Sequence, residues 1–331
     1  AVFGPGRKAA ALEGSKAFAK HIMDAAGVPT GRAVRAGTLA EAEAAIDDLG
    51  APYVVKADGL AAGKGVLVTG DRDAAVDHAR TWLAHGPVLV EEFLAGEEVS
   101  LFLLSDGTTV LPLSPAQDYK RAFDGDLGPN TGGMGAYTPL PWLPEGFVDE
   151  VIARVALPTI RQLDEEGTPF IGLLYCGLIL TRDGVRVIEF NARFGDPETQ
   201  AVLARLTTPL SGLLMAASTG TLGSVPRPEF SDDVAITVVL ASEGYPEAPI
   251  TGRPITGLDA VRDVTIAHAA TVRTEDAIVA TGGRVLSVVA TGSDFTIARA
   301  KAYAALEAIG LDGGHYRADI AAKVAGSGAA R

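Results

Sequence analysis

Apolar and polar positions change along the chain between helical and strand spacing, which predicts a protein of mixed helices and strands. Residues 9–26 are helix formers with an apolar stripe, and Gly27-Val28-Pro29 ends that stretch. Thr38-Leu39-Ala40-Glu41 fits a capping box, which opens a helix to about Leu49. Further helices are expected at 73–84, 147–166, 198–206, from there to 218, and at 294–309. Strands are expected at 52–56, 66–69, 88–92, 98–104, 175–181, 185–191, 235–241 and 285–291.

The stretch from Pro115 to Pro144 breaks this pattern. It holds five Gly and five Pro in 30 residues with no period. A connection of that length is uncommon in a compact domain unless it has a role of its own, so we expect a binding loop. A second change of composition, at Val225-Pro226-Arg227-Pro228, predicts a domain boundary near residue 225.

Acidic residues outnumber basic ones, 41 Asp+Glu against 28 Lys+Arg, which gives a formal net charge of −13. A nucleic-acid binder normally carries a basic stripe for phosphate contacts, so no nucleic-acid partner is expected. The single cysteine, Cys176, excludes an intramolecular disulfide framework and favours a reducing compartment. No uninterrupted apolar run approaches the roughly 18–20 residues of a membrane helix. We therefore expect a cytoplasmic protein with no membrane partner.

A strand that ends at Lys56 is followed by a glycine-rich loop, 57–65, and by a second strand. Glycines let backbone N–H groups approach phosphate oxygens, and Lys56 and Lys64 supply positive charge nearby. The loop is not a Walker motif, because no Gly-Lys-Ser/Thr occurs at the required spacing and a strand follows it. By itself the pattern fits either phosphate binding or an ordinary mobile hairpin.

A carboxylate and an amide alternate on the strand at 185–191. Glu189, Asn191 and Arg193 should face one way, and the intervening residues are apolar, although Val187 breaks the alternation. Carboxylate and amide oxygens suit Mg²⁺, which takes one or two protein ligands beside substrate phosphates. An arginine here could stabilise a transferring phosphoryl group. The other interpretation is the polar outer face of an antiparallel sheet.

Two further segments carry weaker signals. Val90-Glu91-Glu92-Phe93-Leu94 combines an apolar slot with acceptors and could receive a nucleoside, although acids at strand ends are usually only solvated. Asp118-Tyr119-Lys120-Arg121 and the glycine-rich 130–135 lie in the long loop and indicate local anion binding. The five histidines are scattered, and their spacing supports neither a metal site nor a Ser/His/Asp triad.

Four motifs, in this order, resemble the glycinamide ribonucleotide synthetase family of ATP-grasp enzymes. They are Leu12-Glu13-Gly14-Ser15-Lys16-Ala17-Phe18, Val55 to Val66, Gly128-Pro129-Asn130-Thr131-Gly132-Gly133-Met134-Gly135, and Glu189 to Gln200. Gly282-Gly283-Arg284-Val285-Leu286 and Arg317-Ala318-Asp319-Ile320 extend the similarity over essentially the whole chain.

The resemblance implies an α+β protein in which an ATP-grasp fold is followed by a small C-terminal α/β domain. We expect the ATP-grasp domain at 9–225, with a small lid subdomain at about 27–88, and the C-terminal domain at 226–331. Family members begin with a Rossmann-like domain, and residues 1–8 resemble its last strand and exit. Two positions depart from the family: Tyr175-Cys176-Gly177-Leu178 lacks a further acidic metal ligand, and Ala270 stands where the family usually has Gly.

The resemblance also implies roles for individual residues. The positions expected around ATP are Lys16, Lys56, Gly63, Lys64, Gly65, Glu91, Glu92, Phe93, Leu94 and Glu98. Lys16 and Lys56 resemble the phosphate lysines, Glu91 to Leu94 the hinge that receives adenine through its backbone, and Glu98 the ribose contact. Glu189 and Asn191 resemble the ligands of Mg²⁺ or Mn²⁺. Arg193, Asp196, Lys120 and Arg121 are the expected residues for the acyl phosphate and the incoming substrates.

The implied reaction ligates glycine to 5-phosphoribosylamine in purine synthesis through a glycyl phosphate, with ATP as the phosphoryl donor. We expect a monomer or a weak homo-oligomer. Two other hypotheses for the function stay open: another ATP-grasp ligase or carboxylase of purine synthesis, and a nucleotide-binding module that does not catalyse a reaction.

Overall fold

The computed structural model describes residues 1–59 and 65–326. The chain divides into two compact units, which we describe separately. The first unit contains residues 1–113, 144–194 and 210–227, and the second contains 114–143, 195–209 and 228–331. Within the described residues, no helix is both long and apolar enough to cross a membrane.

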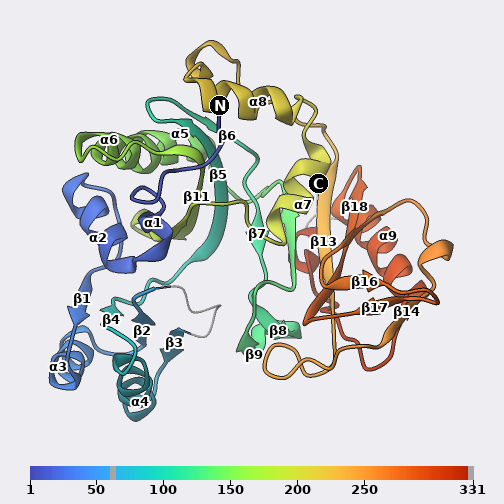
Figure 1. The fold of residues 1–331 in the computed structure, drawn as a ribbon, viewed down its shortest axis with the longest axis horizontal. Helices are drawn as coiled ribbons and strands as arrows, with labels where there is room; N and C mark the ends of the chain where they lie inside the picture. The colour runs from blue at the N-terminus through green and yellow to red at the C-terminus, as the bar shows by residue number, and fades with distance from the viewer. Residues whose placement is uncertain (60–64, 327–331) are drawn as a thin grey trace. The chain divides into compact units, whose positions relative to one another are not determined.

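A small antiparallel sheet and two helices form one part of the first unit (Figure 1). The strand order is β1-β4-β2-β3, with β1 Ala33–Ala36, β4 Val88–Glu91, β2 Tyr53–Ala57 and β3 Val66–Thr69. Helices α3 (Leu39–Leu49) and α4 (Arg72–Leu83) pack on this sheet. The predicted capping box is present, because Thr38 and Glu41 each bond the other's backbone N–H.

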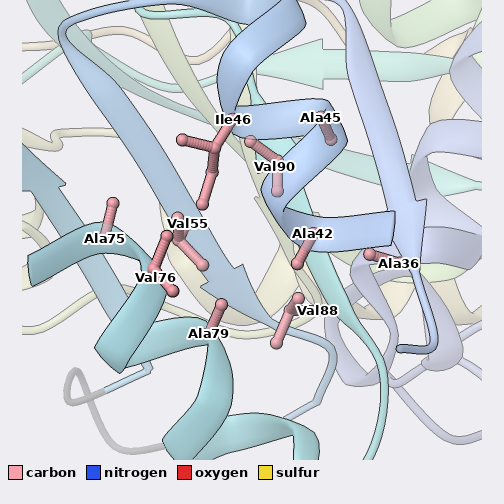
Figure 2. Close-up of a cluster of buried hydrophobic side chains, with 10 residues drawn as sticks. All are labelled: Ala36, Ala42, Ala45, Ile46, Val55, Ala75, Val76, Ala79, Val88 and Val90. Atoms are coloured by element: carbon pink, nitrogen blue, oxygen red, sulfur yellow. The ribbon is translucent and has the colours of Figure 1, made fainter. Parts of the chain in front are cut away.

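Alanine and valine side chains join these helices to the small sheet. Figure 2 shows Ile46 of α3 and Val76 of α4 pointing toward Val55 and Val90 on the central strands β2 and β4. Small residues such as Ala42 and Ala79 let the helices approach the sheet closely. Strand β2, which precedes the glycine-rich segment, therefore lies on a well-packed layer.

A larger antiparallel sheet, in the order β12-β11-β5-β6, forms the centre of the first unit. Its strands are β12 Gly184–Asn191, β11 Ile171–Thr181, β5 Glu97–Asp106 and β6 Val110–Pro112. The first unit also contains α1 Ala11–Gly14, α2 Lys16–Ala25, α5 Phe147–Val151, α6 Leu157–Glu165 and α8 Leu210–Thr219. Helices α1 and α2 contact β12, whereas α8 contacts β5 and β11. The edge strand β12 therefore lies beside the start of α2, and this juxtaposition builds the site.

The second unit contains a five-stranded sheet in the order β15-β18-β13-β10-β7. Its strands are β15 Thr265–His268, β18 Arg284–Gly292, β13 Val234–Ala241, β10 Gly135–Thr138 and β7 Gln117–Asp118. Helices α9 (Phe295–Ala308) and α7 (Glu198–Arg205) pack against β13 and β18. A second sheet of this unit has the order β16 Thr271–Arg273, β17 Ile278–Ala280, β14 Pro254–Thr256 and β19 Gly310–Leu311. The unit also contains the strand pair β8 Arg121–Phe123 and β9 Leu127–Asn130, and the short helix α10 Ala322–Gly326.

Two sequence expectations differ from the structure. The single helix expected at 9–26 is two helices, because Ser15 adopts an extended conformation and its hydroxyl accepts from the backbone N–H of Phe18. The stretch 115–144, expected as a long loop, carries the four short strands β7 to β10, and its binding role stays a prediction. The domain boundary near residue 225 stays a prediction.

Candidate active site

Three lysines and one carboxylate form a charged group of buried and partly buried side chains, which we call the lysine cluster: Lys16, Lys20, Lys56 and Glu91. Lys56 Nζ lies 3.0 Å from Glu91 Oε2, and Lys20 Nζ lies 3.4 Å from the same oxygen. The side chains of Lys20, Lys56 and Glu91 are only 13%, 8% and 7% exposed. Ser15 caps α2 and so places Lys16 at its first position, and Lys20 follows one turn later on the same face.

Burial and charge act against each other on these groups. Burial raises the pKa of Glu91, but Lys56 and Lys20 outweigh it, so the pKa lies below the ordinary value of 4.5. Burial lowers the pKa values of Lys16 and Lys20 despite the carboxylates of Glu189 and Glu91. A polyanion bound beside Lys16 would favour its charged form and relieve this cost.

Lys16 also reaches the base of the glycine-rich loop. Its Nζ donates to the carbonyl of Gly59 at 3.1 Å, and Ser15 Oγ donates to Asp58 Oδ1 at 3.1 Å. At the far side of the loop, the carbonyl of Gly65 accepts from the backbone N–H of Ala57 at 2.7 Å. Gly63 and Lys64, which the sequence singled out for phosphate binding, lie outside the described residues.

The segment Glu91–Leu94 begins at the last paired residue of β4 and continues beyond the small sheet. Glu91 pairs with Ala33 on one side and Val54 on the other, so its main chain belongs to the ladder. The backbone N–H of Glu92 donates to the carbonyl of Arg32 at 2.8 Å. Among the described residues, Phe93 and Leu94 have no main-chain hydrogen bond, and the Phe93 side chain is exposed. Their backbone groups are therefore available to a ligand.

Two other expected nucleotide positions have clear places in the structure. Glu92 Oε2 accepts from the backbone N–H of Arg32 at 3.0 Å, which fixes this side chain at the exit of the sheet. Glu98 lies near the start of β5, paired with Ile179 of β11 and partly buried.

A β-bulge decides which way Glu189 points. The register between β11 and β12 shifts at Gly177 and Leu178, which pair with Glu189 and Val187 and leave Ile188 as the extra residue. Val187 is therefore buried before the bulge and Phe190 after it, while Glu189 and Asn191 share the less buried face. The bulge explains why Val187 breaks the alternation in the sequence.

Arg193 follows this strand and is held by α1. Its Nε donates to Glu13 Oε1 at 3.0 Å, and Glu13 Oε2 accepts from the backbone N–H of Ala192 at 2.9 Å. Glu13 thus orients both the chain and the guanidinium just beyond Asn191. Glu13 belongs to the first of the four motifs, but nothing in its local sequence predicts this role.

The remaining expected residues, Asp196, Lys120 and Arg121, belong to the second unit. Gln200 Nε2 and Arg284 Nη1 both donate to Asp196 Oδ1, each at 3.2 Å. The carbonyl of Lys120 accepts from the backbone N–H of Thr131 at 2.7 Å, and Arg121 Nη1 donates to the carbonyl of Gly128 at 2.9 Å.

The donor set fits a hard divalent cation only in part. In the described chain, no group of three or more His, Cys, Asp or Glu side chains could hold a metal ion. Glu189 and Asn191 offer one carboxylate and one amide oxygen on one strand face, which is the small protein share typical of Mg²⁺ bound with phosphates.

The structure adds Lys20, which the sequence reasoning missed. Lys20 Nζ donates to Thr30 Oγ1 at 2.8 Å and to the carbonyl of Gly31 at 2.9 Å, besides its ion pair with Glu91. Its position four residues after Lys16 on an amphipathic helix was the available signal. The missing information was that β4 would bring Glu91 to this helix face.

Comparisons with known proteins show the family of the chain. Residues 14–199 match the phosphoribosylglycinamide synthetase ATP-grasp (A) domain, and residues 235–323 match the C domain of the same synthetase. A phosphoribosylamine–glycine ligase from Leifsonia xyli subsp. xyli is 73% identical over 327 residues, 97% of this chain and 78% of that protein.

Solved structures give the same result at the level of the fold. The crystal structure of a phosphoribosylamine–glycine ligase from Thermotoga maritima has a TM-score of 0.89 at 36% identity and covers 96% of this chain and 81% of that one. The biotin carboxylase domain of a Hydrogenobacter thermophilus 2-oxoglutarate carboxylase, in complex with MgADP, ADP and bicarbonate, has a TM-score of 0.68 at 17% identity and covers 95% and 69%, respectively. With an ATP-grasp domain and a C domain matched in order, and close relatives along nearly its whole length, the chain belongs to the phosphoribosylglycinamide synthetase family.

Proposed function

We propose that this chain ligates glycine to 5-phosphoribosylamine in purine synthesis, converting ATP to ADP and phosphate. In the first step a glycine carboxylate oxygen attacks the γ-phosphorus of ATP, which gives glycyl phosphate and ADP. In the second step the amine of 5-phosphoribosylamine attacks the carbonyl carbon, the amide forms, a proton is lost and phosphate leaves. The first step is needed because a carboxylate is a poor electrophile until its oxygen becomes part of a leaving group.

The observation that carries this proposal is the lysine cluster beside Glu189, in a chain of this family. Lys56 Nζ donates to the carbonyl of Ile188, next to Glu189, at 3.5 Å. Burial lowers the pKa of Lys16, and the Glu189 carboxylate opposes that shift. Phosphoryl transfer needs positive charge placed in advance where negative charge develops. A phosphate chain beside Lys16 and Lys56 meets that need.

The described contacts support part of the roles proposed around ATP. Lys16 and Lys56 contact the phosphates, together with Gly63, Lys64 and Gly65 of the loop. Glu91 holds Lys56 and Lys20 in place, and Glu92 fixes the exit of β4. The main-chain groups of Phe93 and Leu94 receive adenine, and Glu98 accepts from the ribose hydroxyls.

Glu189 and Asn191 are the proposed ligands of Mg²⁺, for which Mn²⁺ can substitute. When bound, the cation supplies charge neutralisation at the phosphate oxygens. Glu13 keeps Arg193 oriented at the end of the same strand, where its guanidinium can stabilise the acyl phosphate.

Asp196, Lys120 and Arg121 are proposed to handle the incoming substrates. Arg121 and Lys120 can neutralise a phosphate group, and Asp196 can accept from an ammonium or amine. We further propose that the chain works in the cytoplasm as a monomer or weak homo-oligomer, because a formal net charge of −13 disfavours close self-association.

The direct test is ADP formation by the full-length protein with ATP, Mg²⁺, 5-phosphoribosylamine and either glycine or bicarbonate. Glycine-dependent ADP formation is expected. Turnover with bicarbonate alone would favour a carboxylase, and ATP binding in calorimetry without any glycine-dependent turnover would favour a nucleotide-binding module.

Glu189→Gln tests the metal assignment. We expect turnover to fall roughly 100-fold or more, the size seen when one charge-stabilising group is removed, with a much smaller effect on ATP affinity. Glu150→Gln is the matched control, because Glu150 is an exposed carboxylate of the same unit, paired with Arg154 at 2.7 Å. Near-normal kcat of Glu189→Gln at saturating Mg²⁺ would refute the assignment.

A further inference from the structure

Arg284 is the centre of a small network in the second unit that the roles above do not use. The residue begins β18 and follows two glycines, and its side chain is 24% exposed. Its Nη1 lies 2.8 Å from the carbonyl oxygen of Gly132 and 2.7 Å from that of Asp196. The same nitrogen lies 3.2 Å from Asp196 Oδ1. One guanidinium nitrogen therefore joins the glycine-rich segment to both the main chain and the carboxylate of Asp196.

Hydrogen bonds and close contacts hold the glycine-rich segment Gly132–Gly133 in place. The backbone N–H of Gly132 donates to Tyr245 Oη at 2.9 Å, and that of Gly133 donates to Thr131 Oγ1 at 3.0 Å. Gly133 has a φ of +109°, and a Cβ there would lie 2.4 Å from Pro197 Cδ. The segment thus has one backbone path, and it presses against the turn that carries Asp196.

Arg284 packs against Gly132 as well as bonding it. A Cβ on Gly132 would lie only 3.0 Å from Arg284 Cζ. Glycine at this position is what lets the guanidinium reach the carbonyls of both loops. Lysine could not reproduce the arrangement, because its ammonium nitrogen is one bond nearer the backbone than Nη1 and ends a flexible stem.

We propose that Arg284 is a positioning residue that fixes the Gly132–Gly133 segment against Asp196 and thereby sets the direction of the Asp196 carboxylate. The inference rests on the proposed role of Asp196 in handling the incoming substrates. Arg284 acts on the glycine and phosphoribosylamine half of the reaction and leaves ATP binding untouched, because its contacts are all to residues of the second unit. Misplacement of a substrate-handling group by about 1 Å can cost up to about 100-fold in rate.

The test compares Arg284→Lys with Arg253→Lys in the full-length protein. Arg253 is a matched control, since its side chain is 25% exposed and bonds Glu243 Oε2 at 2.6 Å in the same unit. For Arg284→Lys we expect kcat/KM for glycine or 5-phosphoribosylamine to fall about 10- to 100-fold, with the affinity for ATP unchanged in calorimetry. Arg253→Lys should leave all these values unchanged.

A second variant keeps the proposal testable if Arg284→Lys folds poorly. Gly132→Ala leaves every charge in place but displaces the guanidinium, so it should lower the same kcat/KM in the same direction by a smaller factor. Guanidinium ion added to Arg284→Ala should restore part of the lost kcat/KM. A merely structural arginine would give neither the selective loss in substrate kinetics nor the rescue.

Asp196→Asn separates this inference from the proposed site. If Asp196→Asn lowers substrate kinetics while Arg284→Lys behaves as Arg253→Lys does, the positioning role is refuted and the proposed site stands. If Asp196→Asn is itself neutral, both are refuted. Equal losses in ATP affinity and substrate kinetics for Arg284→Lys would also overturn the positioning role.

Discussion

Removal of the Glu91 charge is the sharpest test of the lysine cluster. Glu91→Gln keeps the size of the side chain but leaves Lys56 and Lys20 buried without the carboxylate that lies 3.0 Å and 3.4 Å from them. The variant should unfold at a lower denaturant concentration than the parent protein. The reason is that a buried ammonium without a counter-charge keeps its desolvation cost and loses the compensating attraction.

The size of the effect follows from the geometry. At an effective dielectric constant of about 20, charges separated by 3.0 Å and 3.4 Å attract by roughly 5 kcal/mol each. Much of that attraction offsets the cost of burying three charges, and Lys20 keeps Thr30 Oγ1 and the Gly31 carbonyl as acceptors. We therefore expect a loss of about 3 kcal/mol in the free energy of unfolding, the low end of the range for breaking a buried pair.

The assay is urea unfolding followed by circular dichroism, without ATP, between pH 3 and pH 7, values chosen to bracket the carboxylate range. The pKa of Glu91 in the folded protein lies below 4.5, so its stabilisation is complete above about pH 4.5 and is lost as the pH falls through the folded-state pKa. The difference between parent and Glu91→Gln should thus be constant near neutrality and shrink in acid. Added salt should change it little, because buried pairs are weakly screened.

Asp48→Asn is the control for this experiment. Asp48 pairs with Arg32 at 2.9 Å, but both side chains are more than half exposed, so no measurable change is expected. A Glu91→Gln variant as stable as the parent at pH 7, or a difference that does not shrink in acid, would refute the reasoning.

Three further substitutions test packing and backbone. Ile46→Ala, in the fully buried cluster of Figure 2, should cost about 2–5 kcal/mol in urea unfolding, and a cost below 1 kcal/mol would mean the cluster collapses freely around the gap. Asp106→Asn should lower the free energy of unfolding by about 1–3 kcal/mol near pH 7. The reason is that Asp106 Oδ2 accepts from the backbone N–H of Leu222 at 3.1 Å, which an amide nitrogen cannot do. An unchanged thermal midpoint would contradict this. Gly133→Ala should lower the thermal midpoint and kcat/KM together, because the new Cβ would lie 2.4 Å from Pro197 Cδ; a stable, fully active variant would show that the segment can shift.

Local signals in the sequence identified most elements of the fold. The capping residues Thr38 and Asp294 start helices where expected, since a side-chain oxygen and the following backbone N–H groups are neighbours in sequence. Motif spacing placed Glu189 and Asn191 on a strand. The family and its ATP-grasp fold, inferred from the resemblance, are confirmed by the comparisons.

Contacts between distant parts of the chain could not be predicted from the sequence. The extended Ser15 splits the first helix because Asp58, 43 residues away, accepts from its hydroxyl and from the backbone N–H of Ala17. The bulge at Ile188 changes which residues face the core. Val187 marks a break in the alternation, but the pairing with β11 that makes this break a bulge involves residues distant in sequence. Lys20 gains its partner only when β4 brings Glu91 to α2.

The order in which the second unit receives its strands has a consequence for synthesis. Strand β10 pairs with β13, so Gly135 meets Val238, and β13 pairs in turn with β18 at Val234 and Gly292. A ribosome that adds about 5–20 residues per second exposes β10 roughly 5–20 s before β13 exists. During that interval the edge of β10 that will pair with β13 is open to other chains. The first unit, in contrast, has its last residue at position 227. The five-stranded sheet of the second unit is therefore completed only when β13 and β18 have been made, after the last residue of the first unit.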